Sequence, residues 1–260
     1  MSMPSVMLET RNLTKRYSAI PVVRNVSFMI RPGQILGYLG PNGSGKSTTV
    51  KMLTGLIEPS DGEIWFRGKN VLKNRLWFSK QFGYVPEEPY LYTHLTGREY
   101  LQLVGRLRGI GKTPMERKID ALLDLFGLAD FRDTEMSSYS KGMRQKVLLS
   151  AALLHDPAVL ILDEPFSGLD VTAALVFRSL LQALAAEGKM ILYSSHVLEV
   201  VEKVCSEVLI LHRGQVVAHD SVSRLRDLRS SSSLEEVFSQ LVMHEDASAV
   251  ASQMIAVMRG

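Results

Sequence analysis

Residues 40–48 read GPNGSGKST and directly follow the apolar run ILGYL at 35–39. The spacing of Gly40, Gly45, Lys46 and Ser47 is that of a phosphate-binding loop, where backbone N–H groups and the N-terminus of the next helix surround phosphates. In such a loop the lysine reaches the β- and γ-phosphates, and the hydroxyl group ligates Mg²⁺. The stretch therefore predicts a strand, a nucleoside triphosphate site and a helix in succession. The residues expected to bind the nucleotide here are Gly40, Pro41, Asn42, Gly43, Ser44, Gly45, Lys46, Ser47 and Thr48.

The segments around this loop alternate between strand and helix patterns. A helix is expected over 45–55, and apolar, β-branched runs predict strands at 22–30, 34–40, 63–68, 158–163 and 189–194, with a hairpin over 207–220 that turns at Arg213-Gly214. Such alternation is typical of parallel sheets. The sequence therefore predicts an α/β fold with a mostly parallel sheet and an N-terminal antiparallel β part.

The middle of the chain, about 88–155, has helical patterns only and predicts an all-helical subdomain inserted into the α/β core. Two capping boxes are expected there, one from Thr96 to Glu99 and one from Thr113 to Glu116. In the second, Pro114 would be the first helical residue, and Gly127 would end the helix.

Residues 1–225 are expected to form one ATPase domain, and 226–260 a C-terminal helical extension. The serine run 230–233 is interpreted as a short linker. Its last residue, Ser233, is expected to cap the next helix together with Glu236.

Two acids follow the buried strand pattern AVLIL at 158–162. Asp163 and Glu164 would lie at the carboxyl edge of the sheet, where ligands of open α/β sheets bind. Asp163 suits Mg²⁺ or its water shell, and Glu164 suits polarisation of the attacking water. Next to a phosphate-binding loop, this reading is favoured over a strand that simply ends in two solvated acids.

A second anion site is suggested by YSKGMRQ at 139–145, because serine and glycine at a helix start offer a hydroxyl and open N–H groups. By itself this signal is weak, since serine is a common N-cap.

The order of these motifs, together with SGLD at 167–170 and SSH at 194–196, resembles the nucleotide-binding subunit of an ABC transporter from about Leu8 to about Asp220. The resemblance implies a P-loop NTPase core that hydrolyses ATP with Mg²⁺. It gives GPNGSGKST as Walker A, LILDEP as Walker B, YSKGM as the signature, SGLD as the D-loop and SSH as the switch-histidine loop. It implies that Tyr17 stacks on adenine and that His196 contacts the γ-phosphate. It also implies that Ser140, Gly142 and Asp170 serve the nucleotide of a second subunit in a head-to-tail pair.

The chain departs from the family pattern in two places. Glu87 stands where most members have glutamine. It is expected to ligate Mg²⁺ or a catalytic water, but it brings a negative charge that glutamine lacks. Lys141 and Met143 replace the usual glycine and glutamine of the signature. These variants, with SLEEVF at 233–238, resemble the type-2 exporter subfamily. The catalytic set is thus Lys46, Glu87, Glu164 and His196, and the metal set is Ser47, Glu87 and Asp163.

The composition and charge of the chain bear on which classes of partner it binds. The 260 residues are 46% hydrophobic and 22% charged, and the net charge of +3 is too small to argue for nucleic acid. The single cysteine, Cys205, is expected to be buried near a helix end, and it fits a reducing compartment. No signal peptide or membrane-spanning pattern is visible, which favours a cytoplasmic protein that works at the membrane face through an integral membrane subunit. A second ATPase subunit, identical or related, completes the expected assembly. The alternative is a non-transport ABC-type ATPase module that regulates a partner protein.

Overall fold

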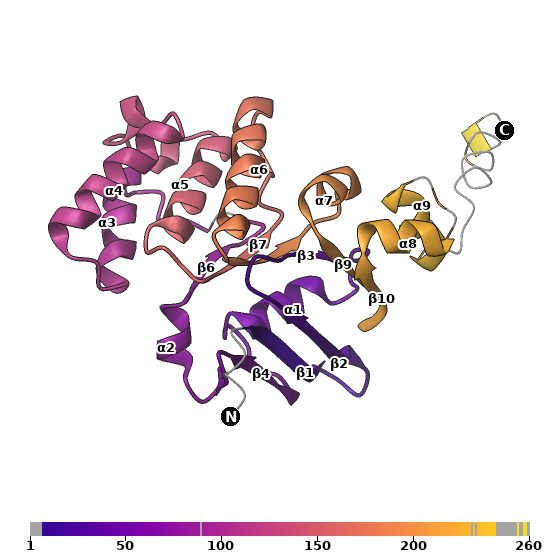
Figure 1. Ribbon diagram of the computed structural model, residues 1–260. Coiled ribbons are helices and arrows are strands. Elements are labelled where there is room, and N and C mark those ends of the chain that lie inside the picture. Colours follow the sequence, from indigo (N-terminus) through magenta and orange to yellow (C-terminus); the bar gives the residue numbers. More distant parts are fainter. Residues whose placement is uncertain are drawn as a thin grey trace.

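The computed structural model describes residues 7–88, 90–229, 231, 233–242, 254, 257 and 258. Two sheets lie against each other with one helix between them, and most of the other helices lie beyond the larger sheet (Figure 1). In the described residues, no helix combines the length and apolar character that a membrane span requires.

The larger sheet has six strands in the order β10-β9-β3-β8-β7-β6. All neighbouring strands are parallel except β10, which pairs antiparallel with β9. Every residue of three central strands is buried, which explains why they appear in the sequence as continuous apolar runs. The strands are β3 (Ile35–Leu39), β6 (Phe82–Val85), β7 (Val159–Asp163), β8 (Met190–Ser194), β9 (Glu207–His212) and β10 (Gln215–Ser221).

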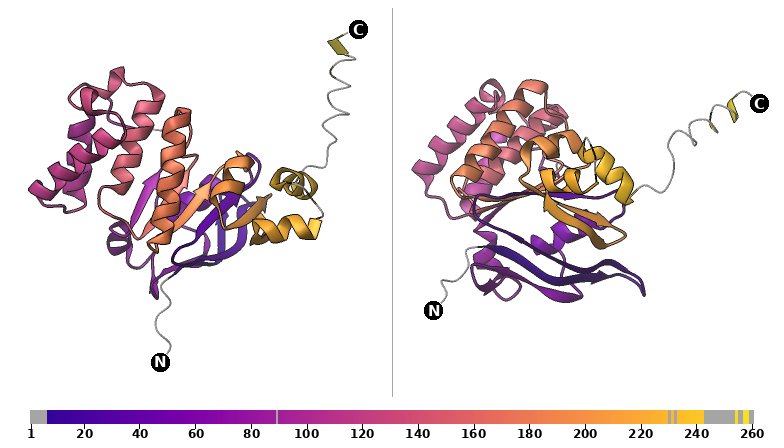
Figure 2. Two further views of the ribbon diagram at one scale, coloured as in Figure 1. Left: turned by 45° about the horizontal axis from the view of Figure 1, so that its top comes forward. Right: turned by 45° about the vertical axis from the view of Figure 1, so that its right-hand side comes forward.

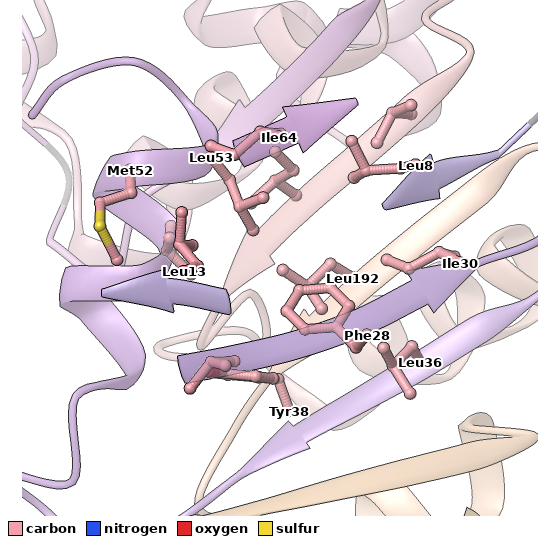
Figure 3. Close-up of a cluster of buried hydrophobic side chains, with 14 of the residues drawn as sticks. Leu8, Leu13, Phe28, Ile30, Leu36, Tyr38, Met52, Leu53, Ile64 and Leu192 are labelled. Atoms are coloured by element: carbon pink, nitrogen blue, oxygen red, sulfur yellow. The ribbon is translucent and has the colours of Figure 1, made fainter. Parts of the chain in front are cut away.

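The smaller sheet is formed mainly by the N-terminal part of the chain, in the order β2-β1-β4-β5 with antiparallel neighbours. Its strands are β1 (Leu8–Arg16), β2 (Pro21–Ile30), β4 (Asp61–Phe66) and β5 (Lys69–Asn70). Side chains of both sheets and of α1 (Lys46–Leu53) share one core (Figure 3). The residues labelled there are Leu8, Leu13, Phe28, Ile30, Leu36, Tyr38, Met52, Leu53, Ile64 and Leu192. This core holds the helix after the phosphate loop between two rigid layers.

Among the remaining helices, α2 (Arg75–Ser79) packs in the core shared with the smaller sheet, and most of the others lie on the far side of the larger sheet (Figure 2). Leu101, Met115, Ile119 and other buried residues of 97–154 make a core of their own, apart from the two that flank the sheet. The helices are α2 (Arg75–Ser79), α3 (Gly97–Leu107), α4 (Lys112–Leu125), α5 (Lys141–Leu153), α6 (Val171–Ala186), α7 (Leu198–Val204), α8 (Val222–Arg229) and α9 (Leu234–Val242), with single 3-10 turns at Ala129–Phe131 and Met136–Ser138.

The structure confirms one of the two capping boxes in this region. Thr96 accepts from the backbone N–H of Glu99, and the Glu99 carboxylate accepts from the backbone N–H of Thr96. The prediction for Thr113 is wrong, because α4 begins at Lys112, two residues before the expected Pro114, and its N-cap is Gly111. A proline in the first helical turn removes no hydrogen bond, since those N–H groups have no partner within the helix. Pro114 is therefore tolerated inside the first turn and does not mark where the helix begins.

Other local predictions agree with the structure. Gly127 follows α4 in the left-handed region, at φ 68°. The β9–β10 hairpin turns at Arg213 and Gly214, both with positive φ. Cys205 is buried at the end of α7. The backbone N–H of Glu236 donates to Ser233 Oγ at 3.3 Å, while Ser230 and Ser232 lie outside the described residues.

Candidate functional site

The phosphate loop connects the end of β3 to the start of α1. Two of its glycines are needed for different reasons: one has a left-handed backbone, and the other leaves no room for a side chain. Gly45 is the residue before α1 and has φ 106°. A Cβ at Gly40 would clash with the carbonyl of Leu211 and with Ser44. The loop therefore closes tightly on β9, which directs the N-terminus of α1 toward the carboxyl edge of the sheet.

Lys46 is the first residue of α1 and its ammonium lies over the loop. Its Nζ donates to the carbonyl oxygens of Gly40 at 2.6 Å and Pro41 at 3.2 Å. Burial lowers its pKa, and the negative charges of Glu164, Asp163 and Glu87 oppose that shift. The cation therefore belongs to a partly desolvated site in which anions favour its charged form.

A pocket of about 160 Å³ opens beside Lys46 at the carboxyl edge of the sheet. It brings together segments that are far apart in the chain, because neighbouring parallel strands end at the same edge. Its lining residues are Val22, Asn42, Gly43, Gly45, Lys46, Ser47, Thr48, Glu87, Asp163, Glu164 and His196. All members of the predicted catalytic and metal sets are in this group.

Glu164 is held in one orientation by its neighbours. Ser195 Oγ donates to its Oε2 at 2.9 Å, and the backbone N–H of His196 donates to its Oε1 at 2.7 Å. His196 Nδ1 lies 2.6 Å from the same Oε1. The backbone of Glu164 is left-handed, at φ 50°. The carboxylate and the imidazole thus form a hydrogen-bonded pair at the mouth of the pocket.

Asp163 precedes this pair at the end of β7 and is almost fully buried. Burial raises its pKa, and the nearby charges of Glu87 and Glu164 act in the same direction. A cation bound near these three acids would relieve their repulsion. The described residues contain no group of three or more His, Cys, Asp and Glu able to hold a metal ion among themselves. The oxygens of Ser47, Asp163 and Glu87 fit Mg²⁺, which takes one or two protein ligands together with substrate phosphates.

The signature residues lie outside this pocket. Ser140 caps α5, with its Oγ accepting from the backbone N–H of Met143 at 3.2 Å. Asp170 caps α6 and accepts from the backbone N–H of Ala173 at 2.8 Å. Neither of them, nor Gly142, lines the pocket beside Lys46. Lys141 is exposed and lines a neighbouring cleft together with Glu87 and Glu164, so its charge faces this acidic group.

The start of α5 is attached to the loop that follows the two acids. Buried Gln145 donates from Nε2 to the carbonyl of Pro165 at 3.0 Å. Lys146 pairs with Asp170 at 3.4 Å, and a Cβ at Gly142 would clash with the Gly168 carbonyl. Sequence reasoning missed Gln145 and Ser195. Both lie in stretches quoted from the sequence, Gln145 in YSKGMRQ and Ser195 in SSH, but neither was given a role there.

Tyr17 remains exposed after β1, with 64% of its surface accessible and Lys15 Nζ 5.2 Å from its ring centre. An exposed ring is compatible with base stacking.

Comparisons with known proteins agree with this geometry. Residues 23–167 match the family model described as ABC transporter. The chain is 37% identical over 230 residues to the ABC transporter ATP-binding protein NatA of Bacillus subtilis (strain 168), covering 88% of this chain and 94% of that protein. It is 38% identical over 221 residues to the bacitracin transport ATP-binding protein BcrA of Enterococcus faecalis, covering 84% and 70% respectively.

Solved structures confirm the predicted fold class. An ATP-binding subunit of an ABC transporter superposes with a TM-score of 0.85 at 35% identity, covering 90% of this chain and 99% of that one. A dimeric ATP-binding cassette bound to ADP and phosphate has the same fold, with a TM-score of 0.76 at 23% identity and coverage of 82% and 98%. Family model, relatives and site geometry lead to one conclusion: the chain belongs to the ABC transporter family and is an ATP-binding subunit, an ATPase, of such a transporter.

Proposed function

We propose that this subunit hydrolyses MgATP within a head-to-tail pair of ATPase subunits and thereby drives export through a separate integral membrane subunit. The observation that carries the proposal is the division of the site. One pocket contains Lys46, the acids and His196, while Ser140 and Gly142 lie outside it on the same chain. Two copies placed head to tail would bring the second group over the nucleotide held by the first.

The polar residues of the pocket have the following roles in this proposal. Lys46 holds the β- and γ-phosphates, with Asn42 and the rest of the loop supplying backbone N–H groups. Glu164 accepts a proton from the attacking water or orients it, and His196 contacts the γ-phosphate while it is held by Glu164. Bound Mg²⁺, ligated by Ser47 and approached by Asp163 and Glu87, would neutralise charge on the phosphate oxygens.

Further support comes from the relatives. The name of BcrA states bacitracin transport. The solved ATP-binding cassette of the same fold is a dimer bound to ADP and phosphate. Export rests on the resemblance of the signature and of SLEEVF to type-2 exporters. In this assembly the subunit would lie at the cytoplasmic face of a membrane, with residues 1–225 as the ATPase domain and 226–260 as its extension.

The test is Lys46→Ala. Loss of the phosphate-binding cation should abolish hydrolysis and sharply weaken ATP binding. Lys51→Ala is the matched control, because Lys51 is an exposed lysine on the same helix. Binding of a fluorescent ATP analogue and release of phosphate measure the two effects. Near-normal ATP turnover by Lys46→Ala would contradict the proposal.

A further inference from the structure

The C-terminal helix α9 reaches the edge of the ATP site. A second pocket, of about 280 Å³, adjoins the first, and Asn42, Glu87 and His196 line both. Phe238, in the middle of α9, lines it together with Gly40, Asn42, Ser195 and His196. An aromatic side chain from the extension therefore lines the same pocket as Ser195 and His196, the residues that orient Glu164.

Helix α9 is held in place by buried side chains and hydrogen bonds. Leu234 and Val237 are completely buried, and both belong to the core cluster beneath α7. Glu202 on α7 accepts from Arg226 at 2.9 Å and from the backbone N–H of Leu234 at 3.4 Å. Helices α7, α8 and α9 lie together at one end of the molecule in both views of Figure 2. Phe238 is thus presented by an anchored helix.

The helix on which α9 packs, α7, begins two residues after His196. Leu198, the first residue of α7, packs in the same cluster as Phe238 and also lines the second pocket. The backbone N–H of Val197 donates to Ser195 Oγ at 3.1 Å, and that oxygen in turn donates to Glu164. The position of residues 195–197 therefore depends on how α7 is packed, and Phe238 contributes to that packing and to the pocket wall.

We propose that Phe238 is a positioning residue for hydrolysis: it supports the segment 195–198 so that His196 and Glu164 keep their orientation toward the γ-phosphate. The extension is then a working part of the ATP site. This inference rests on the proposed roles of Glu164 and His196. A group that positions the reacting atoms can change the rate about 10²-fold through a displacement of 1 Å, without touching substrate itself.

The experiment is a substitution series at Phe238 in the full-length chain, with kcat and KM for ATP measured on each folded variant. Phe238→Ala should lower kcat about tenfold or more, with KM within about twofold, because the change affects orientation rather than ATP binding. Phe238→Leu should be intermediate, and Phe238→Tyr, which keeps the ring, should restore kcat. If the alanine variant fails to fold, the leucine variant replaces it in every comparison below.

Val237→Ala separates positioning from stability. Val237 is the neighbouring residue of α9, buried in the core and absent from the pocket lining, so its truncation should lower Tm and leave kcat near that of the unmodified chain. Ser239→Ala, on the exposed side of α9, is the surface control. An equal kcat loss for Val237→Ala and Phe238→Ala would overturn the inference, as would unchanged kcat at Phe238.

A double variant tests the route of the effect. In a His196→Ala background, Phe238→Ala should lower the rate by a smaller factor than it does in the unmodified chain, because the part of its effect that acts through His196 is already lost. Full additivity of the two losses would overturn the inference.

Lys46→Ala distinguishes the proposed role of Phe238 from the proposed function of the subunit. If Lys46→Ala is inactive while Phe238→Ala turns over normally, only the role of Phe238 fails. If Lys46→Ala remains active, the proposed function fails.

Discussion

At the scale of single residues, Glu164 combines an unusual backbone with an ordered side chain. Its φ of 50° is uncommon for a residue with a long side chain, and such conformations cost about 1–3 kcal/mol where they occur. Hydrogen bonds from Ser195 and His196 hold the carboxylate, and the backbone N–H of Glu164 donates to the Ser194 carbonyl at 2.9 Å. The surrounding structure thus maintains a strained residue at the site where a base is needed.

Glu164→Gln should separate binding from chemistry. Glutamine keeps the size of the side chain but loses basicity and one negative charge, so ATP should still bind while hydrolysis slows about 10²–10⁴-fold. The measurement is the ATPase rate together with ATP affinity. Glu199→Gln, the same charge change on the exposed side of nearby α7, should leave the rate unaltered. Hydrolysis by Glu164→Gln at the rate of the unmodified chain would remove Glu164 from the mechanism.

At the scale of elements, the two threonines near the starts of α3 and α4 should respond differently to truncation. Thr96→Ala removes a reciprocal capping box and should lower the free energy of unfolding by about 1 kcal/mol. Thr113→Ala should change it by less than about 0.5 kcal/mol, because Thr113 is an exposed residue inside α4. Urea denaturation measures both. A larger loss at Thr113 than at Thr96 would contradict the observed start of α4.

The segment before α3 is our candidate docking site for the membrane subunit. Tyr90 and Tyr92 are 82% and 60% exposed, close in sequence to Glu87 of the ATP site, whereas Leu91 packs into the core. Pro89, the residue before Tyr90, lies outside the described residues. Exposed aromatic groups of this kind are typical of interfaces.

Charge substitutions at this patch should uncouple the two subunits. Tyr90→Glu combined with Tyr92→Glu should preserve ATP binding by the isolated subunit and abolish co-purification with its membrane partner. Leu107→Glu, at an equally exposed apolar residue at the end of α3, is the control for a general effect of added charge. Normal assembly and transport by the double variant would place the docking site elsewhere.

At the scale of the whole molecule, the division of the site predicts nucleotide-dependent pairing. If Ser140 and Gly142 of a second copy close over the γ-phosphate, slow hydrolysis should trap the closed pair. Glu164→Gln with ATP should therefore elute as a dimer in size-exclusion chromatography and return to a monomer with ADP, while unmodified protein with ATP should be mostly monomeric. A slow variant that remains monomeric in ATP would favour pairing with a different subunit, or a requirement for the membrane partner.

The sequence by itself determined the features that depend on neighbouring residues. The phosphate loop at 40–48 is one, because its glycines and its helix start act through local backbone geometry. The hairpin turn at Arg213-Gly214 and the Thr96 capping box are others, and all three agree with the structure. The start of α4 was not predicted correctly, because proline is compatible with any place in a first turn and so does not fix where the helix begins.

Only the tertiary structure decided which distant side chains share a site. Glu87, Glu164 and His196 meet because β6, β7 and β8 are neighbours in the sheet, and strand order is not a local property of the sequence. The same is true of Phe238, whose approach to His196 results from the packing of α9 on α7. Local sequence thus determined the chemistry available to this protein. Long-range packing decided which groups meet, because a contact between distant residues forms only when all the intervening elements are in place.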